Sequence, residues 1–347
     1  MSIASLAPAY IRAIMAYQPG KPISELAREM GIPEESIVKL ASNENPLGMS
    51  ARARDAAIAA IGEVSRYPDG GAFALKKALC ERFGVKPEQL VIGNGSNDIL
   101  ELASQAFLAP GLSAVYSRHA FAVYPLATNA RGARGIEVAA KNFGHDLDAM
   151  AAAIEPQTRV VFIANPNNPT GTFVPGAELE AFLAKVPRHV LVVLDEAYTE
   201  YLAPEQRYDS IAWLARFPNL LVSRTFSKAY GLAGLRVGYG IAHPEVADLM
   251  NRVRQPFNVS SVALAAAEAA LGDDEFLARS AELNRRGMTQ LVAAFRELGL
   301  EWIPSAGNFV TFKVADALGV NQALLRQGVI VRPIAAYSMP HWLRVSI

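Results

Sequence analysis

The chain has 347 residues, with 33 Lys and Arg against 33 Asp and Glu, 51% hydrophobic residues and 19% charged residues. This length exceeds the roughly 250–300 residues at which a single core stops growing, so we expect two domains or one large domain with an appendage. The composition excludes a disordered or collagen-like chain, and the balanced charge, without a Lys/Arg run, argues against a nucleic-acid partner.

The low content of charged residues favours a large core and an oligomer. The lone Cys80 allows no intrachain disulfide, and the apolar stretch at the N-terminus is broken at Arg12, unlike a signal peptide. No stretch approaches the ~18 uncharged apolar residues of a membrane helix, because even the Ala-rich run contains Glu268. We therefore expect a soluble, cytoplasmic protein without a membrane partner.

The first forty residues are interrupted by Pro8, Pro19, Gly20, Pro22 and Pro33. Proline fixes φ and removes a backbone donor, so this density of breaks is unfavourable for a packed core element. We interpret residues 1–40 as an N-terminal arm and segment lying over another part of the molecule.

Residues 41–255 alternate short apolar runs, each followed by a polar loop, with helical patterns. This alternation is typical of βα units, and the near-continuous hydrophobicity of the runs indicates strands covered by helices on both faces. The predicted strands are 114–116, 160–164, 190–194, 220–223 and 237–241, and the predicted helices are 177–183 and 211–217. The predicted fold class is α/β, with a doubly wound, mostly parallel sheet in a large domain.

The pattern changes from residue 256 onward. Long helices are predicted at 262–271 and 275–298, followed by strand-like runs at 308–314, 329–332 and 342–347. This order predicts a smaller α+β domain at residues 256–347.

The glycine-rich segment 93–98 begins like a dinucleotide fingerprint but has Asp98 in place of the third glycine. A Walker-type Gly-Lys-Ser/Thr is missing, and none of the five histidines form a His-x-x-x-His pair, so we expect no metal site. The segment does open a predicted helix. Its backbone N–H groups and the Ser96 hydroxyl could bind an anion, although simple helix capping is the commoner role.

Polar residues follow three of the predicted strands. Asn168 follows the strand ending at residue 164, Asp195 and Tyr198 follow the next strand, and Ser227 and Lys228 follow the third. Open α/β sheets bind ligands at this edge, where a lysine can form a Schiff base and a buried aspartate can keep a pyridine nitrogen protonated. Taken singly, Asp195 could be a helix cap, Asn168 a turn residue and Lys228 a solvated loop cation. These roles do not explain why all three occur at one edge of the sheet.

Motifs over nearly the whole chain extend this pattern, at residues 19–22, 41–48, 66–69, 167–171, 195–198, 225–228, 234–239 and 343–347. Together they resemble the pyridoxal-phosphate aminotransferases of fold type I, and the Ser-Lys pair with an arginine eight positions later is highly specific to that family. Within it the chain is most similar to the histidinol-phosphate aminotransferases. Aromatic aminotransferases and threonine-phosphate decarboxylases share most of the motifs.

The resemblance implies a pyridoxal 5'-phosphate cofactor held by Lys228, which also moves the substrate proton. Asp195 would pair with the pyridinium nitrogen, and Tyr198 would bond the phenolic oxygen. The other implied cofactor residues are Ser96, Asn97, Phe121, Asn168, Ser227, Arg236 and, from a second subunit, Tyr67. The implied substrate residues are Arg344 for a carboxylate, Arg332 for a phosphate, and Tyr17, Asn308 and Asn43.

Two departures from the family accompany this resemblance. The chain has His119-Ala120-Phe121 where relatives most often have Pro-Thr-Phe or Pro-Thr-Tyr, so the stacking ring is kept and a hydroxyl is lost. Relatives also continue past the position of Ile347 with a glycine and a final helix, so a trimmed sequence with an incomplete small domain is one expectation.

The main hypothesis is a homodimeric aminotransferase with a shared active site. It would move an amino group between glutamate/2-oxoglutarate and histidinol phosphate/imidazole-acetol phosphate in histidine biosynthesis. One alternative keeps the chemistry but acts on aromatic amino acids. Another is a non-catalytic ligand-binding or regulatory module on the same fold, against which the retained Lys228 argues. Arg332 has a further alternative role as a surface ion-pair partner.

Overall fold

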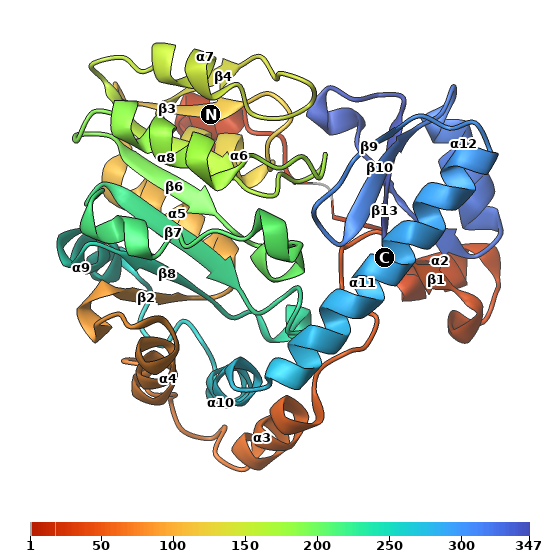
Figure 1. Ribbon diagram of the computed structural model, residues 1–347, viewed down its shortest axis with the longest axis horizontal. Helices are drawn as coiled ribbons and strands as arrows, with labels where there is room; N and C mark the ends of the chain where they lie inside the picture. The colour runs from red at the N-terminus through yellow and green to blue at the C-terminus, as the bar shows by residue number, and fades with distance from the viewer. Residues whose placement is uncertain (1, 18) are drawn as a thin grey trace.

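The computed structural model describes residues 2–17 and 19–347 and contains two main sheets (Figure 1). The larger sheet has seven strands in the order β2-β8-β7-β6-β5-β3-β4. Strands β3 to β7 run parallel to their neighbours within that group, whereas β8 is antiparallel to β2 and β7. The strands are β2 (Leu90–Gly93), β3 (Ser113–Ser117), β4 (Arg134–Val138), β5 (Thr158–Ala164), β6 (Leu191–Asp195), β7 (Leu220–Thr225) and β8 (Gly238–Ala242).

Helices cover both faces of this sheet, because alternate residues of each central strand point to opposite sides. In β5, Val160 and Phe162 pack with one set of helices, while Val161 and Ile163 pack with the other. The first set is α5 (Ser96–Phe107), α6 (Val123–Ala130) and α9 (Pro244–Val253). The second is α3 (Ala51–Ile61), α4 (Phe73–Phe83), α7 (Leu147–Ala152), α8 (Gly176–Lys185) and α10 (Ser261–Leu271). The predicted α/β class with a mostly parallel sheet is confirmed.

The five predicted strands of the large sheet are present, with ends shifted by at most two residues. The sequence reasoning missed β2 and β4. Strand β4 lies at the edge of the sheet and is mostly exposed or half-buried, so it has no continuous hydrophobic run. The helix predicted at 211–217 is wrong, because only a 3₁₀ turn forms at Ala212–Ala215, and Pro218 stops any continuation.

The smaller sheet is antiparallel, with the strand order β12-β13-β10-β9. Its strands are β9 (Trp302–Ile303), β10 (Phe309–Lys313), β12 (Arg332–Pro333) and β13 (Trp342–Ser346). The long helix α11 (Asp274–Glu297) and α12 (Ala317–Arg326) pack against it (Figure 1). Both long helices predicted after residue 256 are present, whereas the run at 329–332 is divided between β11 (Val329–Ile330) and β12. The predicted domain boundaries stay a prediction.

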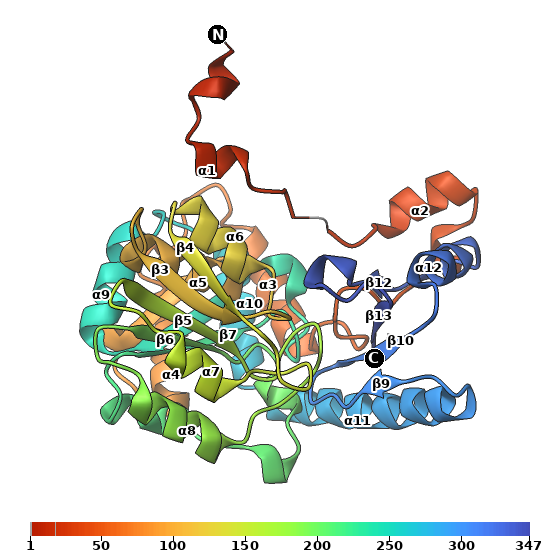
Figure 2. The ribbon, with the colours of Figure 1, turned by 90° about the horizontal axis from the view of Figure 1, so that it is seen from above.

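The N-terminal forty residues behave in two ways. In the segment before residue 18, η1 (Ile3–Leu6) extends away from the body, whereas α1 (Ala9–Arg12) lies against α6 (Figure 2). By contrast, α2 (Ile23–Met30) and β1 (Val38–Lys39) pack beside the smaller sheet, where Leu26 is fully buried and β1 pairs with β11. The expectation that the first forty residues hold no packed element is therefore wrong for this second half, because α2 fits between two prolines.

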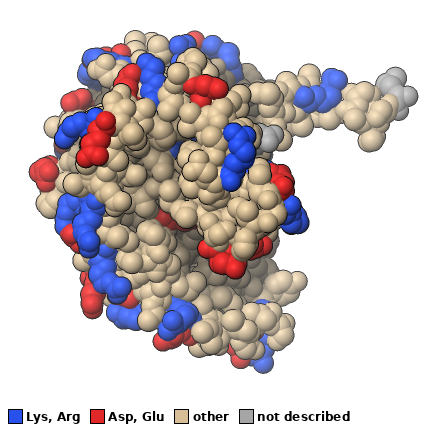
Figure 3. Space-filling view, turned by 90° about the vertical axis from the view of Figure 1, so that its right-hand side faces the viewer, with Lys and Arg blue, Asp and Glu red and all other residues tan. Residues whose placement is uncertain are grey.

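Acidic and basic side chains are interspersed on the face of the molecule formed by the smaller sheet and its helices (Figure 3). None of the helices within residues 2–17 and 19–347 is both long and apolar enough to cross a membrane. In the same residues, no group of three or more His, Cys, Asp or Glu side chains is arranged to hold a metal ion.

Candidate active site

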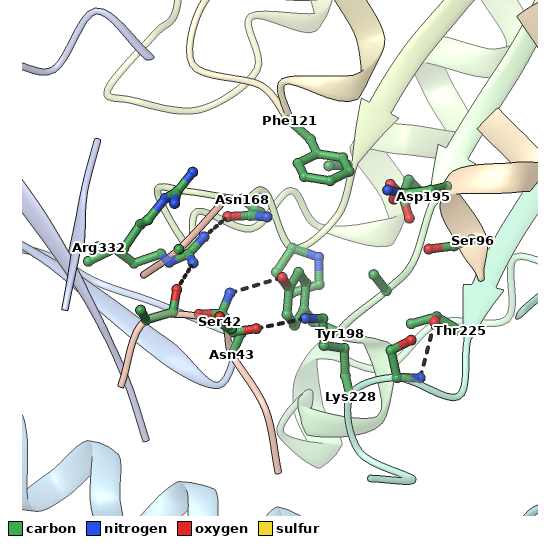
Figure 4. A pocket seen from close by; sticks show the side chains of 18 of the residues that line it. Ser42, Asn43, Ser96, Phe121, Asn168, Asp195, Tyr198, Thr225, Lys228 and Arg332 are labelled. Atoms are coloured by element: carbon green, nitrogen blue, oxygen red, sulfur yellow. Dashed lines mark hydrogen bonds between the residues drawn. The ribbon is translucent and has the colours of Figure 1, made fainter. Parts of the chain in front are cut away.

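A cavity of about 190 Å³ lies at the carboxyl ends of β5, β6 and β7, where the two sheets meet (Figure 4). It gathers side chains from the large sheet, the smaller sheet and the segment around residues 17–43. All of the residues predicted to bind cofactor or substrate line this cavity except Tyr67 and Asn308. Those lining it are Tyr17, Asn43, Ser96, Asn97, Phe121, Asn168, Asp195, Tyr198, Ser227, Lys228, Arg236, Arg332 and Arg344.

Lys228 follows β7 and directs its ammonium group into this cavity. Its Nζ donates a hydrogen bond to the backbone oxygen of Ser42 at 3.1 Å and lies 5.8 Å from the centroid of the Tyr198 ring. Desolvation lowers the pKa of Lys228 to about 7, and the positive charges of Arg344 and Arg236 act in the same direction. A lysine with this pKa has a substantial neutral fraction near pH 7 and can attack a carbonyl carbon.

Asp195 ends β6 and is almost fully buried, at 5% exposure. The Tyr124 hydroxyl donates to its Oδ2 at 3.0 Å, while Oδ1 has no hydrogen-bond partner among the described residues. Burial raises the pKa of Asp195 to about 6. A buried carboxylate oxygen without a partner is costly, so Oδ1 is suited to a ligand that brings a protonated nitrogen.

The N-terminus of α5 forms the opposite end of the cavity. Gly95 caps this helix at φ +80°, and a Cβ there would lie 2.8 Å from Nη2 of Arg236. Gly238 is needed for the same reason, because its Cβ would lie 2.5 Å from the backbone nitrogen of Ser96. The free N–H groups at this helix start, the hydroxyls of Ser96 and Ser227 and the Arg236 guanidinium together can bind a phosphate.

Asp98, which stands in place of the third glycine of a dinucleotide fingerprint, has a structural role. Its Oδ2 accepts hydrogen bonds from the Asn94 backbone nitrogen and from Nδ2 of Asn258, both at 2.8 Å. The carboxylate therefore fixes the turn that precedes α5.

Residues of the smaller sheet form the other wall of the cavity. Arg344 donates from Nη1 to Oδ1 of Asn168 at 2.5 Å and from Nη2 to the backbone oxygen of Ala41 at 2.6 Å. The guanidinium of Arg332 lies 5.6 Å from the centroid of the Tyr17 ring. The guanidinium groups of Arg332, labelled in Figure 4, and of Arg344 therefore line the same cavity as the residues expected to bind the cofactor.

Asn43 adopts a left-handed conformation at φ 53° and donates from Nδ2 to the Tyr198 hydroxyl at 3.0 Å. Asn308 does not line the cavity; its Nδ2 donates to the backbone oxygen of Asn43 at 3.1 Å and so supports that residue.

Tyr67 lies outside the cavity, is 82% exposed, and stacks on Phe257 with ring centroids 4.7 Å apart. His119, in the unusual His-Ala-Phe run, directs Nδ1 to the backbone oxygen of Tyr337 at 2.7 Å.

Sequence reasoning missed several residues at the site. Ser42 and Ala41 contribute backbone oxygens, and Thr225 accepts from the Ser227 backbone nitrogen at 3.1 Å. Backbone acceptors have no signature in a sequence. Tyr124 on α6 donates to Asp195, and the sequence offers no signal for it except that it follows Phe121 by three residues.

The residues of this cavity fit pyridoxal phosphate. Lys228 can bond its aldehyde carbon, the orphan Oδ1 of Asp195 can pair with its ring nitrogen, and the start of α5 can bind its phosphate. The Phe121 ring lines the same cavity and can cover the face of the pyridine.

Comparisons with known proteins agree with this geometry. Residues 35–347 match the model of the family described as aminotransferase class I and II. The chain is 64% identical to histidinol-phosphate aminotransferase 2 of Nitrosospira multiformis, over 100% of this chain and 89% of the relative. It is 66% identical to histidinol-phosphate aminotransferase 1 of Cupriavidus pinatubonensis, over 98% and 92% of the two chains.

Among solved structures, the fold is similar to that of the histidinol-phosphate aminotransferase from Sinorhizobium meliloti in complex with pyridoxal-5'-phosphate. The TM-score is 0.89 at 29% identity, over 97% of this chain and 92% of that one. The chain belongs to the aminotransferase class I and II family.

Proposed function

We propose that this protein is a pyridoxal-phosphate-dependent aminotransferase of histidine biosynthesis. It would move an amino group between histidinol phosphate/imidazole-acetol phosphate and glutamate/2-oxoglutarate. One observation carries the substrate assignment. Arg332 on β12 and Arg344 on β13 are opposite each other in the strand register, and both line the cavity that contains Lys228. Two adjacent guanidinium groups suit a pair of substrates of which one carries a carboxylate and the other a phosphate. The names of the similar proteins support the same assignment.

In this proposal the bound cofactor supplies an electron sink for the charge that develops at the substrate Cα. Lys228 carries the proton to and from that carbon, and Asp195 keeps the ring nitrogen protonated. Tyr198 and Asn168 bind the phenolic oxygen, Phe121 covers the ring, and Ser96, Asn97, Ser227 and Arg236 bind the phosphate. Arg344 orients the glutamate carboxylate, and Arg332, with Tyr17 beside it, orients the phosphate of the other substrate.

The alternative of an aromatic amino acid aminotransferase shares the cofactor chemistry but is not favoured by the relatives described above. A non-catalytic binding module is not favoured either, because Lys228 and the unpartnered Oδ1 of Asp195 serve no purpose in such a module.

We also propose a cytoplasmic homodimer in which Tyr67 reaches the cavity of the second subunit. Tyr67, Val64, Ile61, Ile58 and Phe73 are each more than half exposed, from 55% to 82%, in α3, the start of α4 and the loop between them. Such exposed apolar side chains are suited to burial in a subunit contact. The extended N-terminal segment, with Ile3, Leu6 and Met15 exposed, is suited to lie across a partner (Figure 2).

A half-reaction screen tests the function. The cofactor-loaded protein is mixed with histidinol phosphate, glutamate or phenylalanine as the only amino donor, and the change in cofactor absorbance is followed. We expect fast conversion with histidinol phosphate and glutamate. A preference for phenylalanine would contradict the substrate assignment, and no conversion with any donor would contradict the enzyme assignment.

A further inference from the structure

A tight turn follows the edge strand β4 and contains two consecutive residues in the left-handed region. Its ends are joined by hydrogen bonds from the Lys141 nitrogen to the Gly144 oxygen at 3.1 Å and from the Gly144 nitrogen to the Lys141 oxygen at 2.9 Å. Asn142 has φ 50° and Phe143 has φ 63°. Asparagine tolerates this conformation, but a bulky phenylalanine rarely adopts it, so other contacts must offset the strain.

The Phe143 ring makes those contacts with the smaller sheet and with the segment that joins β12 to β13. It packs against a buried cluster formed by Ile303, Ile334, Tyr337, Met339 and Trp342. Its centroid lies 5.1 Å from that of Trp342, with the ring planes at 63°, which is a favourable edge arrangement. Of the described residues, Ala122 and Phe143 are the half-buried apolar residues that pack against this cluster, and both belong to the part of the chain that forms the larger sheet.

The turn is also fixed at its base. His145 directs Nε2 to the backbone oxygen of Ala164 at 2.8 Å, and Ala164 is the register partner of Asp195 between β5 and β6. The turn is thus attached to the strand ends that carry the cofactor residues, while its Phe143 ring is attached to the smaller sheet. It bridges the two walls of the cavity.

Phe143 contacts β13 at Trp342, the first residue of that strand. Side chains alternate along a strand, so Trp342, Arg344 and Ser346 share one face. Trp342 contacts Phe143, Arg344 donates to Oδ1 of Asn168, and the Ser346 hydroxyl bonds Oδ1 of Asn43 at 3.0 Å. Arg332 on β12 stands opposite Arg344 in the register of the two strands, so any shift of β13 moves both arginines.

We propose that Phe143 is a positioning residue that sets the place of β13, and thereby of Arg344 and Arg332, relative to Lys228. Phe143 does not line the active-site cavity, so it acts through the rings that it contacts, which are Trp342 on β13 and, with centroids 6.0 Å apart, His119. This inference rests on the proposed aminotransferase function and adds a residue that controls how both amino donors bind. His119 keeps a second contact, to the backbone oxygen of Tyr337, and Lys228, Asp195 and the start of α5 do not touch Phe143, so the cofactor affinity should change much less than donor binding.

The test compares Phe143→Ala and Phe143→Leu with two matched controls. Phe143 and Phe173 both line a surface groove beside Trp342, so Phe173→Ala removes a ring from the same groove. The Phe173 ring lies 6.3 Å from that of Tyr208 and is not packed against the Trp342 cluster. Asn142→Gly changes the same turn and leaves the Phe143 ring in place. For each variant the KM and kcat for glutamate and histidinol phosphate are measured, together with the melting temperature and the dissociation constant of pyridoxal phosphate from the apoprotein.

We expect Phe143→Ala to raise the KM of both donors by about 10-fold, with a smaller change in kcat and a much smaller change in cofactor affinity. Phe143→Leu should recover part of the loss, and both controls should have wild-type KM values. A lower melting temperature with unchanged KM in both Phe143 variants, or an equal loss of cofactor affinity, would overturn the proposal. If the wild-type protein turns over neither donor, the proposed function fails instead.

Discussion

Arg344, on a strand of the smaller sheet, donates a 2.5 Å hydrogen bond to Oδ1 of Asn168, in the turn after β5 of the larger sheet. A second bond to the Ala41 oxygen fixes the other arm of the guanidinium. The group expected to bind a substrate carboxylate is therefore held in place by a residue expected to bind the cofactor. Such preorganisation lowers the entropy lost when substrate binds.

Lys228→Ala should abolish turnover and leave the fold intact. In the proposed function, the substitution removes both the nitrogen that would bond the cofactor and the base that would move the proton. Desolvation lowers the pKa of Lys228 to about 7, so its charged ammonium group costs the native state free energy at neutral pH, and loss of that group should not lower the melting temperature of the apoprotein. The measurements are turnover with glutamate, the absorbance of the lysine-linked cofactor and the melting temperature. Turnover at the wild-type rate would disprove the assignment of Lys228.

Asp195→Asn should stabilise the apoprotein while severely lowering turnover. The pKa of Asp195 is raised by burial from 3.8 to about 6, so the ionised carboxylate destabilises the native state above pH 6. This cost disappears as the pH falls from 6 toward 3.8, where the unfolded chain also becomes protonated. The variant should therefore gain up to about 3 kcal/mol of unfolding free energy at pH 8, and less at pH 5.

Denaturant unfolding of the apoprotein at the two pH values measures this gain. The exposed Asp55, with 69% of its side chain accessible, provides the control variant Asp55→Asn, which should show no such gain. Equal stability of wild type and Asp195→Asn at pH 8, with turnover retained, would show that Asp195 only terminates its strand.

The sequence predicted the central sheet because its strands are buried on both faces and therefore read as hydrophobic runs. Strand β4 escaped prediction because an edge strand needs no such run. The strand-end residues Asn168, Asp195 and Lys228 could be predicted because parallel strands bring their carboxyl ends to one edge. The backbone oxygens of Ala41 and Ser42 and the strained turn at Phe143 could not, since they depend on how distant segments meet.

Mixed dimers test whether the cavity is shared between subunits. If Tyr67 completes the phosphate site of the neighbouring subunit, a Tyr67→Ala variant and a Lys228→Ala variant should each be inactive or strongly impaired. Hybrid dimers of the two would contain one cavity with both residues intact, so about a quarter of wild-type activity should return when half of the dimers are hybrid. Activity and subunit exchange are measured on the same mixture. Proven exchange without any recovery would argue that Tyr67 acts within its own subunit, and a fully active Tyr67→Ala variant would show that Tyr67 takes no part.

The two arginines should differ in which donor they serve. Arg344→Lys replaces a bidentate guanidinium with a point charge, which cannot form both bonds to a carboxylate and also loses the contacts to Asn168 and Ala41. We expect the glutamate half-reaction to suffer most in this variant. Arg332→Ala should instead weaken histidinol phosphate, which has a phosphate and no carboxylate, by about 2–3 kcal/mol in kcat/KM.

The measurement is kcat/KM for histidinol phosphate, glutamate and phenylalanine in the wild type and in both variants. Arg332 lies against the Tyr17 ring, so Tyr17→Phe, which keeps the ring, is a suitable control and should preserve that contact. Phenylalanine has a carboxylate but no phosphate, and should therefore follow the glutamate pattern. An equal loss for all three donors in Arg332→Ala would mean that this arginine supports the cavity in general and does not read a phosphate. In that case the choice of substrate would have to be made by other side chains of the cavity.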